Sequence, residues 1–368
     1  MVRFGQSAHA NAHEMAYGRC MRKGTIMAKT TIKRIVRSMV PDALLHARRD
    51  RRERRRMYRD GRRQLARFDR YYSREYSTDT GRIETRIMFC VHQIEKGLTH
   101  DDFRAGFGKG ALRGLAEAMA ALRRADDRYA DNVVYRQALS ALHAYRKRHE
   151  AIGYDVSSLE AMFPEDVRAS IGSAPVGLSG GLVIDAASKT GNRDVDFRSL
   201  AEHRFAIREY SSRPVDETQL IEAVQIAMKT PSVCNRQSSR VYVILDPRKI
   251  KELLDLQGGL HGYPMPPALM FVTSDIRAFM NFAERNEPFV DGGLFSMSLL
   301  YALEYVGLAA CPLNAMFDED KARRTREVLG VPDWELPVMY ISIGHFPEHA
   351  QVCRSSRFPV ERVTTIIK

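Results

Sequence analysis

The sequence lacks the features that mark secreted, zinc-binding or membrane-spanning proteins. Its five cysteines are scattered along 368 residues, and no two of them form a Cys-x-x-Cys pair. This usage argues against a disulfide framework and a zinc site, and it predicts a cytoplasmic location. The first thirty residues hold no continuous apolar stretch, so we expect no signal peptide. The longest apolar run, residues 289–310, includes Asp291 and Glu304, which predicts a buried helix and not a membrane span.

Positive charge is concentrated at one end of the chain. The net charge is +12, but residues 1–75 hold 21 Lys and Arg against 7 Asp and Glu, so the other 293 residues sum to −2. Residues 1–40 form a basic segment that we expect to be disordered. From residue 41 to about 74 we expect a helix, because Leu65, Phe68 and Tyr72 recur at helical spacing.

The ten arginines between residues 48 and 63 leave two readings of this predicted helix open. The helix is either exposed to solvent on all sides, or residues 41–75 contact a membrane surface or an acidic polymer. No recognised nucleic-acid module is present, so we expect no sequence-specific binding to nucleic acid.

The next part of the chain is predicted to be a mostly helical accessory region that extends from residue 41 to 190. Apolar spacing indicates helices at residues 80–95, 109–125 and 131–149, followed by an irregular surface stretch at 151–193. His92 and Glu95 have a spacing that suits a metal, but no second ligand pair is near, so we expect none. The glycine-rich loop 103–108 either caps a ligand pocket or simply connects two helices.

Residues 191–368 are predicted to form a body in which strands and helices alternate. Short apolar runs predict strands at 241–245, 268–273 and 335–343, and extended chain at 309–313 and 358–367. Helices are expected from the capping residue Asp216 and at 247–257, 288–306 and 321–329. These are too few for a doubly wound sheet, so the fold class is α+β.

A candidate ligand site opens this body. Arg204 and Arg208 are four residues apart, and Ser232, Asn235 and Gln237 follow after a predicted helix. Arginine binds phosphate through two donors, whereas Asn and Gln donate and accept in one plane, as a flat polar ring requires. The alternative is that the two arginines form an ordinary solvated surface pair.

The body resembles the nitroreductase family of FMN-dependent oxidoreductases over about residues 195–366. The resemblance rests on seven short stretches that occur in the family's order. They are residues 204–210 (RFAIREY), 231–237 (PSVCNRQ), 266–272 (PPALMFV), 291–293 (DGG), 311–314 (CPLN), 343–347 (IGHFP) and 357–361 (RFPVE).

The resemblance implies a mixed sheet flanked by helices, with FMN held by residues of these stretches. Arg204, Arg208 and Arg357 would hold the phosphate, with Phe205 and Ala206 in the same stretch. Ser232, Asn235 and Gln237 would bond the ribityl chain and ring edge, and Pro312, Leu313 and Asn314 would approach the ring. His261 and Tyr263 would face the open side of the pocket, unless they belong to an ordinary mobile loop; no catalytic acid or base is assigned.

The implied activity is hydride transfer from NAD(P)H through flavin N5 to an organic acceptor: a nitro compound, a quinone or a biosynthetic intermediate. The family also implies a homodimer built around residues 288–306. The chain departs from the family at Phe205, Ala206 and Ser238-Ser239, where an arginine, a serine and Pro-Trp are usual. These departures leave two alternatives open: a specialised flavin reaction, or a non-enzymatic scaffold that its basic arm tethers to a membrane surface or acidic polymer.

Overall fold

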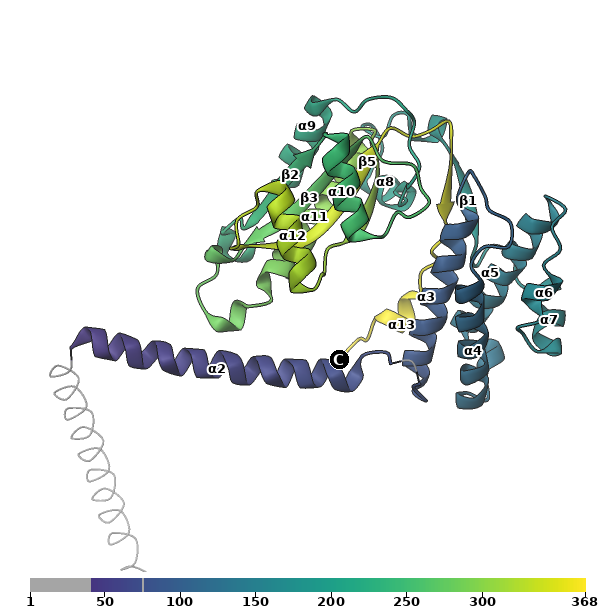
Figure 1. The fold of residues 1–368 in the computed structure, drawn as a ribbon, viewed down its shortest axis with the longest axis horizontal. Coiled ribbons are helices and arrows are strands. Elements are labelled where there is room, and N and C mark those ends of the chain that lie inside the picture. The colour runs from purple at the N-terminus through teal and green to yellow at the C-terminus, as the bar shows by residue number, and fades with distance from the viewer. Residues whose placement is uncertain (1–40, 75) are drawn as a thin grey trace, which may run out of the picture. The chain divides into compact units, whose positions relative to one another are not determined.

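The computed structural model describes residues 41–74 and 76–368, which divide into two compact units between Arg70 and Tyr71 (Figure 1). The segment expected to be disordered, residues 1–40, lies outside these described ranges. The first unit is described as one helix, α2 (Asp42–Tyr71), which confirms the predicted basic helix. No residue of α2 is buried, so its stability comes from local interactions such as the Arg49–Glu53 pair four residues apart.

The second unit begins with three helices that pack around their own apolar core, and all three were predicted. They are α3 (Thr80–Leu98), α4 (Lys109–Ala125) and α5 (Val133–Glu150). Asp79 and Asn132 cap α3 and α5 by accepting bonds from Arg82 N and Val134 N. Two short helices follow, α6 (Ser157–Glu160) and α7 (Glu165–Gly172), whose Leu159, Val167 and Ile171 join the same core.

The prediction of an irregular surface stretch at residues 151–193 is wrong in part. Besides the two short helices, it contains β1 (Gly181–Asp185), which pairs antiparallel with β6 (His349–Cys353) near the other end of the chain. The predicted extended tail at 358–367 likewise contains a short helix, α13 (Val360–Val363). Five-residue strands whose partners lie about 170 residues away leave too weak a local pattern to be recognised.

A four-stranded sheet forms the centre of the body, as the α+β prediction requires. Its order is β2-β3-β5-β4, with every neighbouring pair antiparallel. One isolated parallel bridge between Ala206 and Ala310 places the chain around Ala206 beside the β4 edge. The strands are β2 (Ser239–Ile244), β3 (Ala268–Asp275), β4 (Ala309–Asn314) and β5 (Glu335–Gly344).

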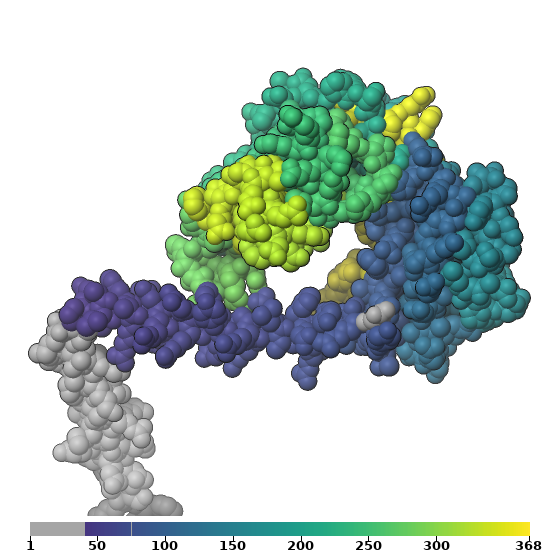
Figure 2. Space-filling model, viewed as in Figure 1, coloured from purple at the N-terminus to yellow at the C-terminus, as the bar shows by residue number. Residues whose placement is uncertain are grey.

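Helices cover both faces of this sheet (Figure 1), and β3 shows why. Its residues are all buried, with Ala268, Met270 and Val272 on one face and Leu269 and Phe271 on the other. The first face packs against α9 (Glu217–Ala227) and α11 (Glu287–Tyr305), and the second against α10 (Pro247–Gln257) and α12 (Glu319–Leu329). Helices α10 and α12 lie side by side on the surface seen in Figure 2.

Helix α11 confirms the predicted long apolar helix, with ten buried residues. Within the residues that the structure describes, no helix is both long enough and apolar enough to cross a membrane.

A buried ion pair fixes the end of the accessory region to α11. Lys189 donates to Glu304 Oε1 at 2.7 Å, and the two side chains are 3% and 2% exposed. Asn192 Nδ2 also donates to the carbonyl oxygen of Glu304, at 2.9 Å. The segment predicted to run over the surface therefore sends a charge into the core here.

Replacing Lys189 by Met should lower the free energy of unfolding by about 3 kcal/mol, because Glu304 then keeps an uncompensated buried charge. Urea unfolding measures this change. The double variant Lys189→Met/Glu304→Leu should recover most of the loss, whereas Lys147→Met, which breaks an exposed pair with Glu150, should cost less than about 1 kcal/mol. If Lys189→Met and Lys147→Met lowered the free energy of unfolding equally, the pair of Lys189 with Glu304 would not be a buried ion pair.

Candidate functional site

The two arginines that open the candidate site lie on an extended segment at the edge of the sheet. Helix α8 (Phe197–His203) ends at Arg204, and the next residues run parallel to β4, with Ile207 N donating to Ala310 O. Side chains alternate along extended chain, so Arg204 and Arg208 point to one side. Phe205 and Ile207 belong instead to the apolar cluster that contains Val352 of β6.

Arg208 is not a solvated surface residue: it is only 9% exposed. Among the described residues its guanidinium donates to uncharged groups, 3.4 Å to Ala206 O and 3.4 Å to Cys353 Sγ. Arg204 Nη1 is fully buried and has no hydrogen-bond partner. No carboxylate of the described residues lies within 4.0 Å of either guanidinium, and Glu304, whose pKa burial raises and the nearby Arg204 charge lowers, is already paired directly with Lys189. The reading of the two arginines as a solvated pair is therefore wrong.

A third cation joins them, and the sequence did not indicate it. Burial raises the pKa of the Cys311 thiol, while Arg208, Lys96 and Arg204 all lower it, so all three cations lie near this β4 residue. Burial also raises the pKa of Cys353 beside Arg208. Both thiols are therefore neutral at physiological pH, and neither balances the three positive charges.

Lys96 comes from the last turn of α3, in the accessory region. Its Nζ donates to Gly259 O at 2.8 Å, and its carbonyl accepts from Tyr263 Oη at 2.8 Å. Tyr263 Oη also lies 3.2 Å from Thr99 Oγ1, and the His100 ring stacks on the Tyr263 ring at 3.8 Å. The end of α3 is thus built into the same place as the predicted pocket residue Tyr263.

Two titratable groups lie beside these residues. Burial raises the pKa of Glu209 to about 7, although the Asp101 backbone N–H that it accepts favours the charged form. Burial, with the nearby Lys96 charge, lowers the pKa of His100, whose Nδ1 lies 3.8 Å from Glu209. Perturbed groups that meet in this way are typical of functional sites.

A cavity of about 460 Å³ opens next to His100. The predicted glycine-rich loop lines it through Arg104, Phe107 and Gly108, opposite His261 and Gly262. Gly97 makes this wall possible, because a Cβ there would lie 1.8 Å from the Phe107 ring. The loop therefore lines a cavity and does more than connect two helices.

The other predicted half of the site, residues 231–237, is a strained loop before β2. Cys234, Asn235 and Gln237 all have positive φ, at 47°, 54° and 50°. Such strain clusters at ligand sites and costs about 1–3 kcal/mol a residue. The loop is anchored where Val233 N donates to Asp291 Oδ1 of α11 at 3.1 Å.

Ser232 and Gln237 line a small cavity of about 170 Å³, and Asn235 is exposed. The departure at Ser238 has a local reason. Its buried hydroxyl accepts from Ser274 Oγ at 2.9 Å, which joins β2 to β3.

One chain does not bring the two halves together. The 231–237 loop leads into β2, whereas the segment with the two arginines lies beside β4. Strands β3 and β5 lie between β2 and β4 in the sheet. Three strand spacings alone amount to about 14 Å. Pro312, Leu313 and Asn314 lie on β4, beside the segment that carries the arginines. Asn314 Oδ1 accepts a hydrogen bond from Met316 N. Arg357 is exposed and donates to Ser355 O, so its place beside the other arginines stays a prediction.

Three potential metal ligands, His92, Glu95 and Cys353, lie within 4.8 Å of one another. Glu95 Oε1 already accepts from Ser179 Oγ at 2.7 Å and Gly180 N at 3.0 Å, and the Cys353 thiol is neutral. Because Glu95 is bonded to this loop, we read the group as a hydrogen-bonded junction between α3 and the loop before β1.

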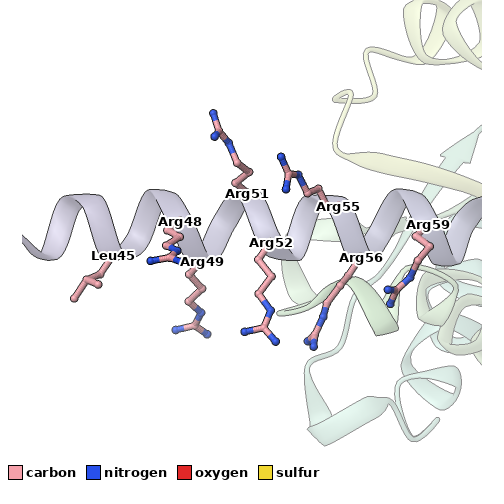
Figure 3. Close-up of a pocket in the computed structure, with 8 residues that line it drawn as sticks. All are labelled: Leu45, Arg48, Arg49, Arg51, Arg52, Arg55, Arg56 and Arg59. Carbon is pink, nitrogen blue, oxygen red and sulfur yellow. The ribbon is translucent and has the colours of Figure 1, made fainter. Parts of the chain in front are cut away.

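The arginines of α2 form a second candidate surface, which we call the arginine stripe: Arg48, Arg49, Arg52, Arg56 and Arg59. Figure 3 shows Arg49, Arg52, Arg56 and Arg59 extending from one side of the helix with Leu45, whereas Arg51 and Arg55 extend from the other. Spacings of three and four residues place the stripe along one face.

Comparison with known proteins gives a consistent result for the body. Residues 201–261 match the nitroreductase family. The chain is 25% identical over 181 residues to an FMN reductase [NAD(P)H] of Bacillus subtilis (strain 168), covering 45% of this chain and 71% of that protein. It is 26% identical over 200 residues to an NADH dehydrogenase of Thermus thermophilus, covering 46% and 95%. A solved FMN-dependent nitroreductase of Clostridium difficile R20291 is 21% identical, with a TM-score of 0.35, covering 40% and 87%.

Proposed function

Residues 201–261 of this chain match the nitroreductase family, and from this similarity we propose that the protein is an FMN-dependent NAD(P)H oxidoreductase. The observation that carries the proposal is the unbalanced positive charge at Arg204 and Arg208. A buried cation without a partner costs several kcal/mol, so such a pair is stable only where an anion binds.

The residues present fit the phosphate of a mononucleotide. Arg204 Nη1 offers an unused buried donor, and Arg208 offers a guanidinium that donates to a backbone carbonyl and a thiol. FMN, when bound, would accept a hydride from NAD(P)H and pass it to an organic acceptor. In this proposal Arg204 and Arg208 bind the phosphate. The flavin ring lies against Pro312, Leu313 and Asn314 on the neighbouring β4.

We assign the cavity of about 460 Å³ to the second substrate, because it adjoins the cation cluster through His100. Reduction of an acceptor consumes a proton as well as a hydride. Glu209, with its pKa raised to about 7 by burial, is able to hold that proton at neutral pH, and His100 lies beside it. The chemical identity of the acceptor within the nitro, quinone or biosynthetic classes follows from acceptor screening of the purified protein.

The proposal also implies a homodimer in the cytoplasm. Ser232, Asn235 and Gln237 lie at the opposite edge of the sheet from Arg204, so both sets bind one FMN only if two chains contribute. Helix α11 carries the 231–237 loop through Asp291 and exposes Val290 and Leu294, which are four residues apart. An exposed apolar strip of this kind on a long central helix suits a helix of a second copy.

Full-length protein should purify with bound FMN, identified by mass spectrometry, and NADH or NADPH should bleach its visible absorbance without oxygen. Arg208→Gln should raise the FMN dissociation constant about 10- to 100-fold, since a charged hydrogen bond contributes about 1.5–3 kcal/mol. Arg213→Gln, an exposed arginine of the same segment, should change it less than about twofold. A colourless protein that takes up no FMN would support the non-enzymatic scaffold instead.

Leu294→Glu should convert the dimer to a monomer and abolish FMN binding, because it places charges in the interface and removes the partner's loop. Light scattering after gel filtration measures the mass, and fluorescence titration measures binding. Ile152→Glu, at another exposed apolar residue, should change neither. A wild-type monomer that binds FMN would refute the two-chain site.

We further propose that the arginine stripe of α2 contacts an extended array of negative charge, a membrane surface or an acidic polymer. The stripe is exposed, and each arginine near an anionic surface contributes about 1 kcal/mol. This proposal is independent of the flavin site and also holds for a scaffold without activity.

Changing Arg48, Arg49, Arg52 and Arg56 to Gln should weaken binding to phosphatidylserine vesicles, or to polyphosphate, about a thousandfold at low salt. Cosedimentation tests the vesicles, and fluorescence anisotropy tests polyphosphate. Arg113, Arg124, Arg136 and Arg248, all exposed elsewhere, provide a control with four equal changes. If both quadruple variants bind alike, the stripe is only a solvated face. Flavin binding should be unchanged in both variants.

A further inference from the structure

Lys96 is the one cation of the site that lies outside the region resembling the nitroreductase family. It occupies the last turn of α3, 108 positions before Arg204, yet both residues lower the pKa of Cys311 together with Arg208. Two contacts through Cys353 connect the two regions: Arg208 Nη1 lies 3.4 Å from Cys353 Sγ, which lies 4.0 Å from Thr99 Oγ1.

The approach of the accessory region to the arginine segment is tightly fixed. Asp101 N donates to both carboxylate oxygens of Glu209, at 3.2 and 3.3 Å. Tyr263 Oη bonds both Lys96 O and Thr99 Oγ1. Residues 96–101 therefore run beside residues 208–209, and the Lys96 ammonium is held there by Gly259 O.

A purely structural role accounts for only part of this arrangement. A lysine in the last turn of a helix complements the terminal carbonyls, and its bond to Gly259 O uses one of its three donors. Such a role is fulfilled as well in water, away from other cations. Here burial and the Arg208 charge both lower the pKa of Lys96, so folding brings two positive groups together at a cost.

An anion removes that cost, because it attracts all three cations and accepts their free N–H groups. No carboxylate of the described chain lies within 4.0 Å of Lys96 Nζ, and the nearby thiols are neutral. Resting on the proposed function, we infer that Lys96 is a phosphate-binding residue: it completes a three-cation site with Arg204 and Arg208. The accessory helices thereby form part of the nucleotide site.

The full-length Lys96→Gln variant tests this inference by titration with FMN and with riboflavin, which lacks the phosphate. We expect the FMN dissociation constant to rise about tenfold or more, with less than a twofold change for riboflavin. Lys96→Arg should retain most of the FMN affinity. Lys109→Gln, at an exposed lysine of α4, should change neither constant.

The phosphate could also belong to the nicotinamide nucleotide, and the assay separates the two sources. Unchanged flavin constants with a KM for NADH or NADPH raised tenfold would assign the phosphate to the electron donor. Equal weakening of FMN and riboflavin would show that Lys96 only supports the fold, and would overturn the inference. The inference would also be overturned if Lys96→Gln equalled wild type in the dissociation constants for FMN and riboflavin and in the KM values for NADH and NADPH. If the wild-type chain binds neither flavin, the proposed function itself fails.

Discussion

Positive charge that is buried without a counter-charge is the constraint on which the rest of the site depends. The segment that carries Arg204 and Arg208 is anchored to the sheet by hydrogen bonds. Tyr210 Oη donates toward Ile207 O at 2.8 Å and lies 2.8 Å from Ser342 Oγ of β5. Gly344 lets the tyrosine approach, because a Cβ there would lie 2.6 Å from Tyr210 Cβ. The sheet thus fixes the backbone from which both arginines extend.

The accessory region is joined to the body by contacts of several chemical kinds. Strand β1 pairs with β6, Lys189 pairs with Glu304 in the core, and Glu209 accepts the Asp101 N–H. Each contact links chain segments more than 100 residues apart. Two of them lie at the site: β6 ends at Cys353, and Glu209 is next to Arg208. Removal of this region would therefore disturb the site, whereas α2 belongs to a separate unit.

Features set by local patterns were predictable, and features set by distant contacts were not. Strand β3 is a continuous apolar run and α11 a long apolar helix, so both were found close to their observed bounds. The arginines and the 231–237 loop were found through resemblance. Strands β1 and β6 were missed, because each pairs only with the other, far along the chain. Lys96 reads in sequence as an ordinary helix-end lysine, and only tertiary structure places it beside Arg208. The positive φ of Cys234 likewise leaves no mark in the sequence.

The two groups of arginines in this chain show why burial, and not residue count, determines what positive charge means. On α2 the guanidiniums are exposed and interspersed with Asp50, Glu53 and Asp60, so water and salt screen them at little cost. Such a surface selects charge density and not a particular molecule. Arg204 and Arg208 lie where water does not solvate them fully, so each needs a partner of defined size and position. A single phosphate meets that need, and an extended surface does not. In the proposed function the smaller cluster is therefore the specific site, although it holds far less of the charge.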